Sequence, residues 1–372
     1  MRLLLLFLFS STIFCCHAQT FNLLIGTYTG TGSKGIYVYR FNATAGVATW
    51  VSNTDSVTNP SYLAISRNGK YVYAVNETNG DNPGTVSSFA FDKAIGKLNF
   101  INRQLSGGGH PCYISESSDN KWVAVGNYSG GNFAILPVNE NGELQPYAQL
   151  IQHSGSSVNN QREEKAHVHA AVFSPDGAFL FTPDLGIDKI MIYKFTPASD
   201  TPLQPAAHSF VSTTAGNGPR HFTFHPDNKF AYLVEELSGT VAAYSYNNGN
   251  LKFLQRISTH PKNYKGTIGS ADIHISPDGK FLYASNRGDA NTITIFSINK
   301  ITGKLVLKGY QPTLGKAPRN FIIDPTGNYL LAANQNTDNI VIFKRNKLTG
   351  LLKNSGKQIK IPKPVCLKMI KL

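Results

Sequence analysis

Short apolar stretches separated by polar turns recur along this chain. Each repeat has an apolar run, a polar turn such as SPDG or DPTG, a second apolar run and a loop rich in Asn or Gly. Six copies occupy residues 62–77, 113–128, 170–185, 222–237, 272–287 and 321–336. A third apolar run such as TVAAYSY follows, and turns of the NKITGKL type lead into a fourth. The period of about 50 residues therefore predicts one four-stranded propeller blade per repeat.

A seventh repeat is divided between the two ends of the chain. FNLLIGTYTG, KGIYVYRF and GVATWVSN predict its second, third and fourth strands, and the C-terminal PVCLKMIK resembles the first strands of the other repeats. Pairing these segments would close the ring and remove its open edge. We therefore predict an all-β fold: a single seven-bladed β-propeller over residues 19–372. The alternatives, a solenoid or a two-domain sandwich, are less favoured.

The first 18 residues have a different composition from the repeats. MRLLLLFLFSSTIFCCHA has one arginine, an apolar core and a small residue at its end, as a secretory signal peptide does. The segment is too short to span a membrane. We expect cleavage near Ala18 and export to the periplasm or the exterior. A lipid anchor on Cys15 or Cys16 is less favoured, since phenylalanine and isoleucine lie before these cysteines.

Two further cysteines, Cys112 and Cys366, remain after that segment. These two cysteines could form a disulfide in an oxidising compartment, but two cysteines are too few for a fold built on disulfides. Their spacing is also unlike that of zinc ligands. We expect two buried free thiols.

The chain is basic, with a formal net charge of +13. Its lysines are scattered through turns such as RNGK and SPDGK, and no basic stripe is interleaved with aromatic residues. We therefore expect no nucleic-acid partner and attribute the charge to surface lysines and a few functional arginines.

The residues at the start of each first strand occupy equivalent positions around the predicted ring, so they should face a shared channel. These residues are Ser61, Cys112, His169, Arg220, Asp272 (or Ala271), Arg319 and Val365. Proline before several of these strands gives a stiff, extended start. We expect His169, Arg220 and Arg319 to converge.

The ends of the second strands feed the same face. They add Arg287 and one glutamate of the pair Glu235 and Glu236, which the repeat pattern does not distinguish. Arginine offers a planar fork for carboxylate or phosphate and can stabilise an oxyanion. Histidine or glutamate can move a proton or activate water. Such a pocket suits an anionic or oxygen-rich small substrate.

Two histidines, His167 and His169, lie two residues apart in QREEKAHVHA, so on an extended chain they point the same way. As a metal pair they lack an obvious third ligand. We interpret His169 as a base supported by His167. QREEKA is then a loop over the channel mouth, with Arg162 or Lys165 reaching toward an anion. Singly, these histidines could be structural, and Arg220 could form an inter-blade salt bridge.

Taken together, the motifs resemble the seven-bladed propeller lactonase family, which includes bacterial propeller-type 6-phosphogluconolactonases and fungal carboxymuconate cyclases. The motifs include IGTYTG (25–30), NPSYLAIS (59–66), NYSGGNFAILPV (127–138), AHVHAAVFSPDG (166–177), GNGPRHFTFHPDNK (216–229) and SADIHISPDGKFLYASNRG (270–288). The resemblance implies a catalytic group of His169, Arg220, Glu236 and Arg287.

Around that group, we expect His167, Arg319, Asn286 and Asn127 to bind substrate. The sequence departs from the family pattern at Ala166, where the family has proline, and at Glu235, where it has asparagine. Glu235 should place a negative charge near the pocket and weaken phosphate binding.

The function we expect is hydrolysis of a sugar lactone or other anionic lactone by a monomer, without metal or cofactor. Arg220 and Arg287 would hold the acidic group of the substrate and stabilise the oxyanion, and His169 or Glu236 would activate water. Two alternatives remain open, because a fold alone does not choose a chemistry. One is a propeller that only binds a ligand or a protein, and the other is a muconate-cyclase-like lyase.

Overall fold

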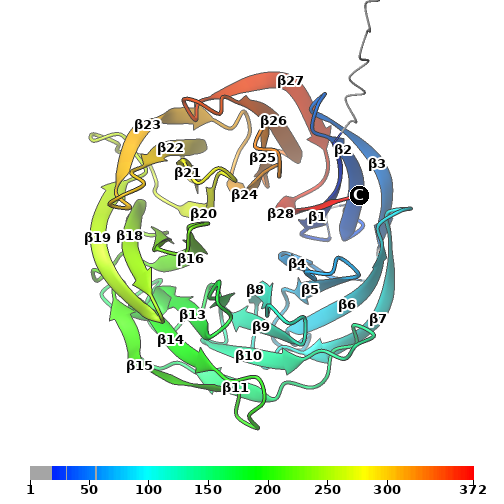
Figure 1. The fold of residues 1–372 in the computed structure, drawn as a ribbon, viewed down its shortest axis with the longest axis vertical. Coiled ribbons are helices and arrows are strands. Elements are labelled where there is room, and N and C mark those ends of the chain that lie inside the picture. The colour runs from blue at the N-terminus through cyan, green and yellow to red at the C-terminus, as the bar shows by residue number, and fades with distance from the viewer. Residues whose placement is uncertain (1–18, 31, 55–56) are drawn as a thin grey trace, which may run out of the picture.

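The computed structural model describes residues 19–372 apart from residue 31 and residues 55–56. In this part of the chain, strands β1 to β28 form seven four-stranded antiparallel sheets arranged around a central axis (Figure 1). The predicted seven-bladed propeller is therefore confirmed. The predicted signal peptide, with Cys15 and Cys16, lies outside the described residues.

Each sheet runs outward from an inner strand near the axis. The closing sheet contains β28 (Pro364–Lys371), β1 (Thr20–Thr27), β2 (Ile36–Asn42) and β3 (Val47–Thr54). The next sheets are β4 (Leu63–Ile65), β5 (Tyr71–Asn76), β6 (Thr85–Asp92) and β7 (Lys97–Leu105), then β8 (Pro111–Glu116), β9 (Trp122–Asn127), β10 (Asn132–Pro137) and β11 (Gln149–Gln152), and then β12 (Val172–Phe173), β13 (Phe179–Asp184), β14 (Lys189–Phe195) and β15 (Leu203–Ser212). The last three are β16 (Pro219–Phe224), β17 (Phe230–Glu235), β18 (Thr240–Asn247) and β19 (Asn250–Ser258), then β20 (Ser270–Ile275), β21 (Phe281–Asn286), β22 (Thr292–Ile298) and β23 (Leu305–Pro312), and finally β24 (Pro318–Ile323), β25 (Tyr329–Asn334), β26 (Asn339–Arg345) and β27 (Leu352–Lys360). A short 3-10 turn, η1 (Leu185–Ile187), follows β13.

The ring is closed by the two ends of the chain. β1 pairs antiparallel with β28, with Leu24 opposite Lys368, so the predicted closure is confirmed (Figure 1). The thiol of Cys366 accepts a hydrogen bond from the backbone N–H of Leu63 in the next blade, at 3.3 Å. Cys366 and Cys112 are both buried, unpaired thiols, as expected. No helix in the described part of the chain is long and apolar enough to cross a bilayer.

The apolar runs of the sequence fill the contacts between neighbouring blades. Second strands such as β17 and β21 are buried along their whole length, whereas outer strands such as β15 alternate between buried or half-buried and exposed residues. Phe181 of one blade stacks on Phe222 of the next, with ring centroids 5.5 Å apart. Each blade therefore packs between two others, and this packing positions the inner strands around the axis.

Several inner strands begin with an irregular pairing. The register shifts between Pro111 and Tyr113, between Pro219 and Phe222, between Ser270 and Ile273, and between Pro318 and Asn320. A β-bulge of this kind changes the direction of the side chains within it. The bulged positions include Cys112, Arg220, Asp272 and Arg319, so the bulges set where these side chains point.

The fourth blade differs from that pattern. Its inner strand β12 has only Val172 and Phe173, and the segment with the two histidines precedes it. That segment is held to β13 by an isolated bridge between Val168 and Asp184 and by a hydrogen bond from the backbone N–H of His169 to the carbonyl of Pro183, at 3.0 Å. The two histidines therefore do not lie in a regular strand.

Candidate functional site

A polar cavity of about 220 Å³ lies where the inner strands begin and the second strands end. All seven blades and one loop supply its walls. The lining residues are Tyr28, Glu77, Cys112, Tyr128, Arg162, His169, Glu236, Arg287 and Arg319. The volume suits a small molecule rather than a polymer.

Most of the wall comes from one repeated position, the residue directly after a second strand. Tyr28, Glu77, Tyr128, Glu236 and Arg287 follow β1, β5, β9, β17 and β21. A pattern in the sequence could have identified the three that we did not select, Tyr28, Glu77 and Tyr128, because all five occupy the same place in the repeat.

The residue before that position points the other way, because neighbouring side chains on a strand alternate. Asn127 donates to the carbonyl of Ser106 at 2.8 Å, and Asn286 donates to the carbonyl of Thr259 at 3.0 Å. Both asparagines are buried and hold loops together. Contrary to our expectation that they bind substrate, neither lines the cavity.

Glu235 obeys the same alternation. Its carboxylate accepts hydrogen bonds from Nε and Nη2 of Arg256 at 2.7 and 3.0 Å, and another from Thr240. Contrary to our expectation, the negative charge of Glu235 does not lie at the pocket, because Arg256 neutralises it outside the cavity. Glu236, the next residue, is the glutamate that lines the cavity.

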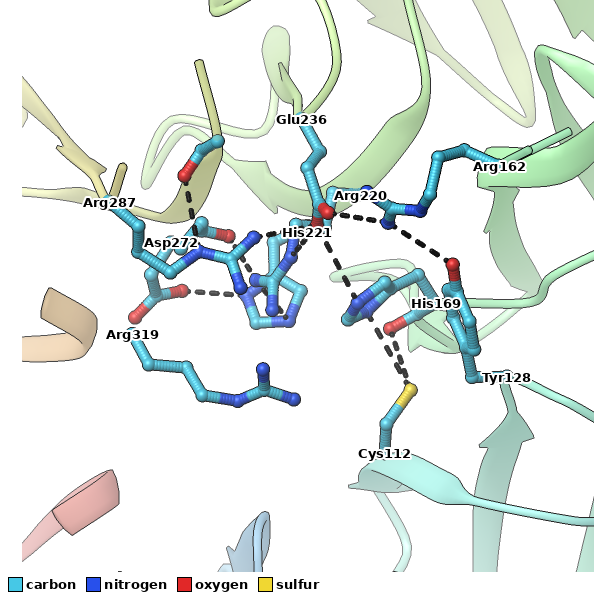
Figure 2. A network of polar contacts seen from close by, with 12 residues as sticks. Cys112, Tyr128, Arg162, His169, Arg220, His221, Glu236, Asp272, Arg287 and Arg319 are labelled. Carbon is cyan, nitrogen blue, oxygen red and sulfur yellow. Dashed lines mark hydrogen bonds and ion pairs between the residues drawn. The ribbon is translucent and has the colours of Figure 1, made fainter. Parts of the chain in front are cut away.

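Three arginines hold Glu236 in place. Its Oε2 atom is 2.7 Å from Nε of Arg220 and 3.0 Å from Nη2 of Arg287, and its Oε1 atom accepts from Nη2 of Arg162 at 2.7 Å (Figure 2). Burial alone would raise the pKa of Glu236, but Arg287, Arg220 and His169 outweigh it and hold this pKa well below its usual range. Glu236 is therefore a charged group at neutral pH and a weak base.

Arg220 lies behind Glu236 rather than in the cavity wall. It is 1% exposed, and its Nη1 donates to the carbonyl of Ala271 and lies 3.3 Å from Nε2 of His221. His221 in turn pairs with Asp272, with Nδ1 and Oδ1 2.7 Å apart. Contrary to our expectation, Arg220 is not placed to hold the acidic group of a substrate, because these neighbours enclose it.

Arg287 does reach the cavity. Its Nε donates to the carbonyl of Gly269 at 3.1 Å, which fixes the guanidinium beside Glu236. Burial lowers the pKa of Arg287 to about 10, with Glu236 opposing and Arg220 and Arg319 adding to the shift. The side chain remains a cation at neutral pH and presents fixed donors to the cavity.

His169 faces Glu236 across the cavity wall. Its Nε2 atom is 4.0 Å from Oε2 of Glu236, and its Nδ1 atom is 3.6 Å from the sulfur of Cys112 (Figure 2). Burial, followed by the charge of Arg220, lowers the pKa of His169 well below its usual value. The imidazole is therefore neutral at pH 7 and able to accept a proton.

His167 is placed differently from its neighbour. It stacks on Tyr128 with ring centroids 4.4 Å apart, and its nitrogens lie 3.0 Å from the carbonyl of Tyr128 and 3.1 Å from Glu164. Contrary to our expectation, it does not line the cavity, whereas His169, whose ring is T-shaped to that of Tyr128 at 5.4 Å, does. Among the described residues, no group of three or more His, Cys, Asp or Glu side chains could hold a metal ion.

The opposite part of the wall contains Arg319, as expected, together with Tyr28 and Glu77. Nη2 of Arg319 is 3.8 Å from Oε2 of Glu77, and this oxygen accepts a hydrogen bond from the hydroxyl of Tyr28 at 2.8 Å. The guanidinium also lies over the ring of Tyr28, 5.4 Å from its centroid.

The loop with QREEKA contributes Arg162 to the mouth of the cavity. Its side chain is 41% exposed, and besides Glu236 it contacts the hydroxyl of Tyr128 at 3.2 Å. Lys165, the other candidate, donates to the carbonyl of Ser129 at 2.9 Å and does not line the cavity. Of the two predicted cations, the structure brings only Arg162 to the site.

Comparison with known proteins agrees with this architecture. Residues 22–369 match the family model described as "Lactonase, 7-bladed beta-propeller". The chain belongs to the seven-bladed propeller lactonase family. Among its relatives, a 6-phosphogluconolactonase of Formosa agariphila is 41% identical over 91% of this chain and 96% of its own length, and that of Bacillus subtilis is 36% identical over 93% and 97%. The solved structure of a periplasmic gluconolactonase from Pseudomonas aeruginosa is 37% identical, covers 94% of this chain and 99% of its own, and superposes with a TM-score of 0.91.

Proposed function

We propose that this propeller lactonase hydrolyses lactones in the cavity between His169, Glu236 and Arg287. The observation that carries the proposal is a neutral, buried histidine facing a carboxylate that three arginines hold in place. A proton acceptor beside fixed positive donors is what water attack on an ester carbonyl requires. The names of the relatives, 6-phosphogluconolactonase and gluconolactonase, support the same reaction class.

His169 is the base in this proposal, and Glu236 is not. The three arginines depress the pKa of Glu236 so far that it has little tendency to take a proton. The imidazole is uncharged at neutral pH, and with its proton on Nδ1, toward Cys112, its Nε2 lone pair is free to accept one from water. Glu236 then orders the arginines and stabilises the imidazolium as it forms.

Arg287 is the residue that stabilises the oxyanion. As His169 removes a proton from water, the hydroxide adds to the lactone carbonyl, and the carbonyl oxygen becomes negative beside Arg287. Collapse of this intermediate breaks the bond to the ring oxygen, which receives the proton back from His169. The product is a hydroxy acid, and one water molecule is consumed.

Cys112 is also in the cavity wall, but a thioester route is disfavoured. Burial, followed by the charge of Glu77, raises the pKa of the Cys112 thiol to about 12, so it is protonated at neutral pH. Because the thiolate is the nucleophilic form, this thiol is better suited to orient His169 than to attack a carbonyl.

The setting of the reaction is part of the proposal. We propose that residues 1–18 direct export and are removed near Ala18, and that the mature chain acts as a monomer in the periplasm or outside the cell. The signal-like composition of the N-terminus supports export, and the Pseudomonas aeruginosa relative is named as periplasmic.

The test is a lactone panel followed in a pH-stat at pH 6.5, with spontaneous hydrolysis subtracted. We expect purified protein to release acid from glucono-δ-lactone faster than the background, and His169→Asn to lose nearly all of this acceleration. Heavy-oxygen water should label the product carboxylate, which separates hydrolysis from lyase chemistry. Absence of any acceleration across the panel would overturn the proposal.

A further inference from the structure

We infer that Tyr28, Glu77 and Arg319 form a subsite for the hydroxyl groups of an uncharged, polyhydroxylated lactone. The inference rests on the proposed function, since it assumes that the carbonyl of the substrate lies against Arg287 and His169. The ring hydroxyls then reach the opposite part of the wall.

Unused hydrogen-bonding capacity is concentrated in this subsite. Within the described part of the chain, Arg319 has no hydrogen-bond partner, and its nearest carboxylate oxygen is Oε2 of Glu77 at 3.8 Å. Oε1 of Glu77 likewise has no partner among the described residues, although Oε2 is held by Tyr28. Both groups line the cavity.

These groups are nevertheless fixed in position. The backbone N–H of Glu77 donates to the carbonyl of Asn59 at 3.0 Å, and the side chain of Asn59 donates back to the carbonyl of Glu77 at 3.2 Å. The backbone N–H of Tyr28, after β1, donates to the carbonyl of Lys363, before β28, at 3.0 Å within the closing blade. The Glu77 carboxylate is held by the hydroxyl of Tyr28 at 2.8 Å, and the Arg319 guanidinium packs over the ring of Tyr28, 5.4 Å from its centroid, so both groups are positioned before a ligand arrives.

A sugar-like hydroxyl matches this pair because it donates and accepts at once. Glu77 accepts from a hydroxyl, and Arg319 donates to the same or the neighbouring oxygen. A hydrocarbon ring would leave both groups desolvated and unpaired, and buried polar groups without partners disfavour binding strongly.

A phosphate or carboxylate on the substrate matches the subsite less well. An anion bound to Arg319 would lie beside the Glu77 carboxylate, and like charges at such a distance repel in a partly buried site. The other cations of the cavity, Arg162 and Arg287, are already paired with Glu236. The subsite therefore selects an uncharged lactone over its phosphorylated counterpart.

The test compares kcat/KM for three δ-lactones: glucono-δ-lactone, its 6-phosphate and δ-valerolactone, which has no hydroxyls. Wild type should prefer glucono-δ-lactone over both others. In Glu77→Gln, and also in Tyr28→Phe, which removes only a hydroxyl, kcat/KM should fall for glucono-δ-lactone by at least ten times the factor by which it falls for δ-valerolactone. Glu77→Gln should also reduce the ratio of kcat/KM for glucono-δ-lactone to kcat/KM for its 6-phosphate. Glu140→Gln, a carboxylate removed from an exposed turn, is the matched control and should retain wild-type values.

Binding measured without turnover separates this inference from the proposed function. 1,5-Anhydro-D-glucitol has the hydroxylated ring but no carbonyl, and calorimetry should show that wild type binds it and that Glu77→Gln binds it at least tenfold more weakly. If the lactones are not hydrolysed but this difference holds, the proposed function fails and the subsite stands. A wild type that prefers the 6-phosphate, variants that slow all lactones equally, or no binding of the probe would each overturn the subsite.

Discussion

Two glutamates in one cavity show how the same position in a repeat acquires different chemistry. Glu77 and Glu236 each follow the second strand of their blade, and both line the cavity. Glu236 is held by three arginines within 3.0 Å, whereas Glu77 has the hydroxyl of Tyr28 and one arginine at 3.8 Å. The position in the repeat therefore decides where a side chain points. The ionic partners of Glu236 come from its own blade (Arg220), from the next blade (Arg287) and from a loop (Arg162).

The difference divides the cavity by function. The Glu236 part has its charges paired and its donors fixed before any substrate arrives, and preorganisation of this kind is what lowers a barrier. Among the described residues, the Glu77 part has donors and acceptors without hydrogen-bond partners, which suits recognition.

Replacing Glu236 should have the largest effect. In Glu236→Gln the three arginines lose their shared counter-charge, so we expect kcat/KM to fall by about 10³-fold or more and stability to fall by about 3–5 kcal/mol, as for a broken buried ion pair. Steady-state kinetics and thermal unfolding measure the two effects. The neighbouring Glu235→Gln is the matched control. It breaks a pair outside the cavity, so it should lower stability but change kcat/KM of the folded protein by less than about threefold. Equal kinetic losses in the two variants would contradict the division.

Replacing His169 should lower kcat far more than replacing His167. His169→Asn removes the proposed base, and we expect kcat to fall by about 10²–10⁴-fold. His167→Asn removes a ring that stacks on Tyr128 and contacts its carbonyl and Glu164 but does not line the cavity, so its main effect should be a lower unfolding temperature. Measurement of kcat at pH 7 for both variants tests this difference. A His167 variant as inactive as the His169 variant would show that the two act as one unit.

The dependence of activity and stability on pH should reflect burial of the histidines. A base is active when unprotonated, and the lowered pKa of His169 keeps it so; kcat/KM should therefore stay level from pH 7.5 to 6.5 and decline only well below pH 6.5. An unperturbed histidine would cause a decline near pH 6.5.

Stability should respond to acid in the same direction. Burial, then Arg220, lowers the pKa of His221 to about 4, so the unfolded chain takes up protons before the folded one does. The free energy of unfolding should therefore decrease as pH falls from about 6.5 toward 4. Thermal unfolding across this range is the measurement, and a flat profile would contradict a buried neutral His221.

Arg162 should give the smallest effect. It is the most exposed of the three arginines on Glu236, and an exposed pair contributes about 1 kcal/mol or less. We expect Arg162→Gln to lower kcat/KM by less than about tenfold, and added salt to affect wild type more than this variant. Kinetics at two ionic strengths would measure both. A loss as deep as that of Glu236→Gln would mean that Arg162 is part of the reacting group.

Prediction from the sequence succeeded where a residue repeats with the blades. Period and turn chemistry indicated the ring and its closure. Equivalence between repeats predicted that His169, Arg319, Arg287 and one of Glu235 and Glu236 converge, and the family resemblance selected Glu236 of that pair. Prediction failed where a difference of one position along a strand reverses the direction of the side chain. Asn127 and Asn286 are one position away from the lining residues Tyr128 and Arg287, and alternation directs them into the blade.

By itself, therefore, the sequence determined the architecture of this protein, because periodic apolar runs permit few ways of burying their surface. It also determined the inventory of charged groups that the ring can bring together. Only the tertiary structure decided which of these groups are already paired. It placed Arg220 behind Glu236 and His169, but not His167, in the cavity wall. Within the part of the chain that the structure describes, it left Glu77 and Arg319 with hydrogen-bonding groups that have no partner. The reason is that burial and ionic pairing depend on contacts between residues far apart in the sequence, within a blade and between blades. The β-bulges and the irregular segment before β12 set the geometry of these contacts, and the repeat pattern does not predict them.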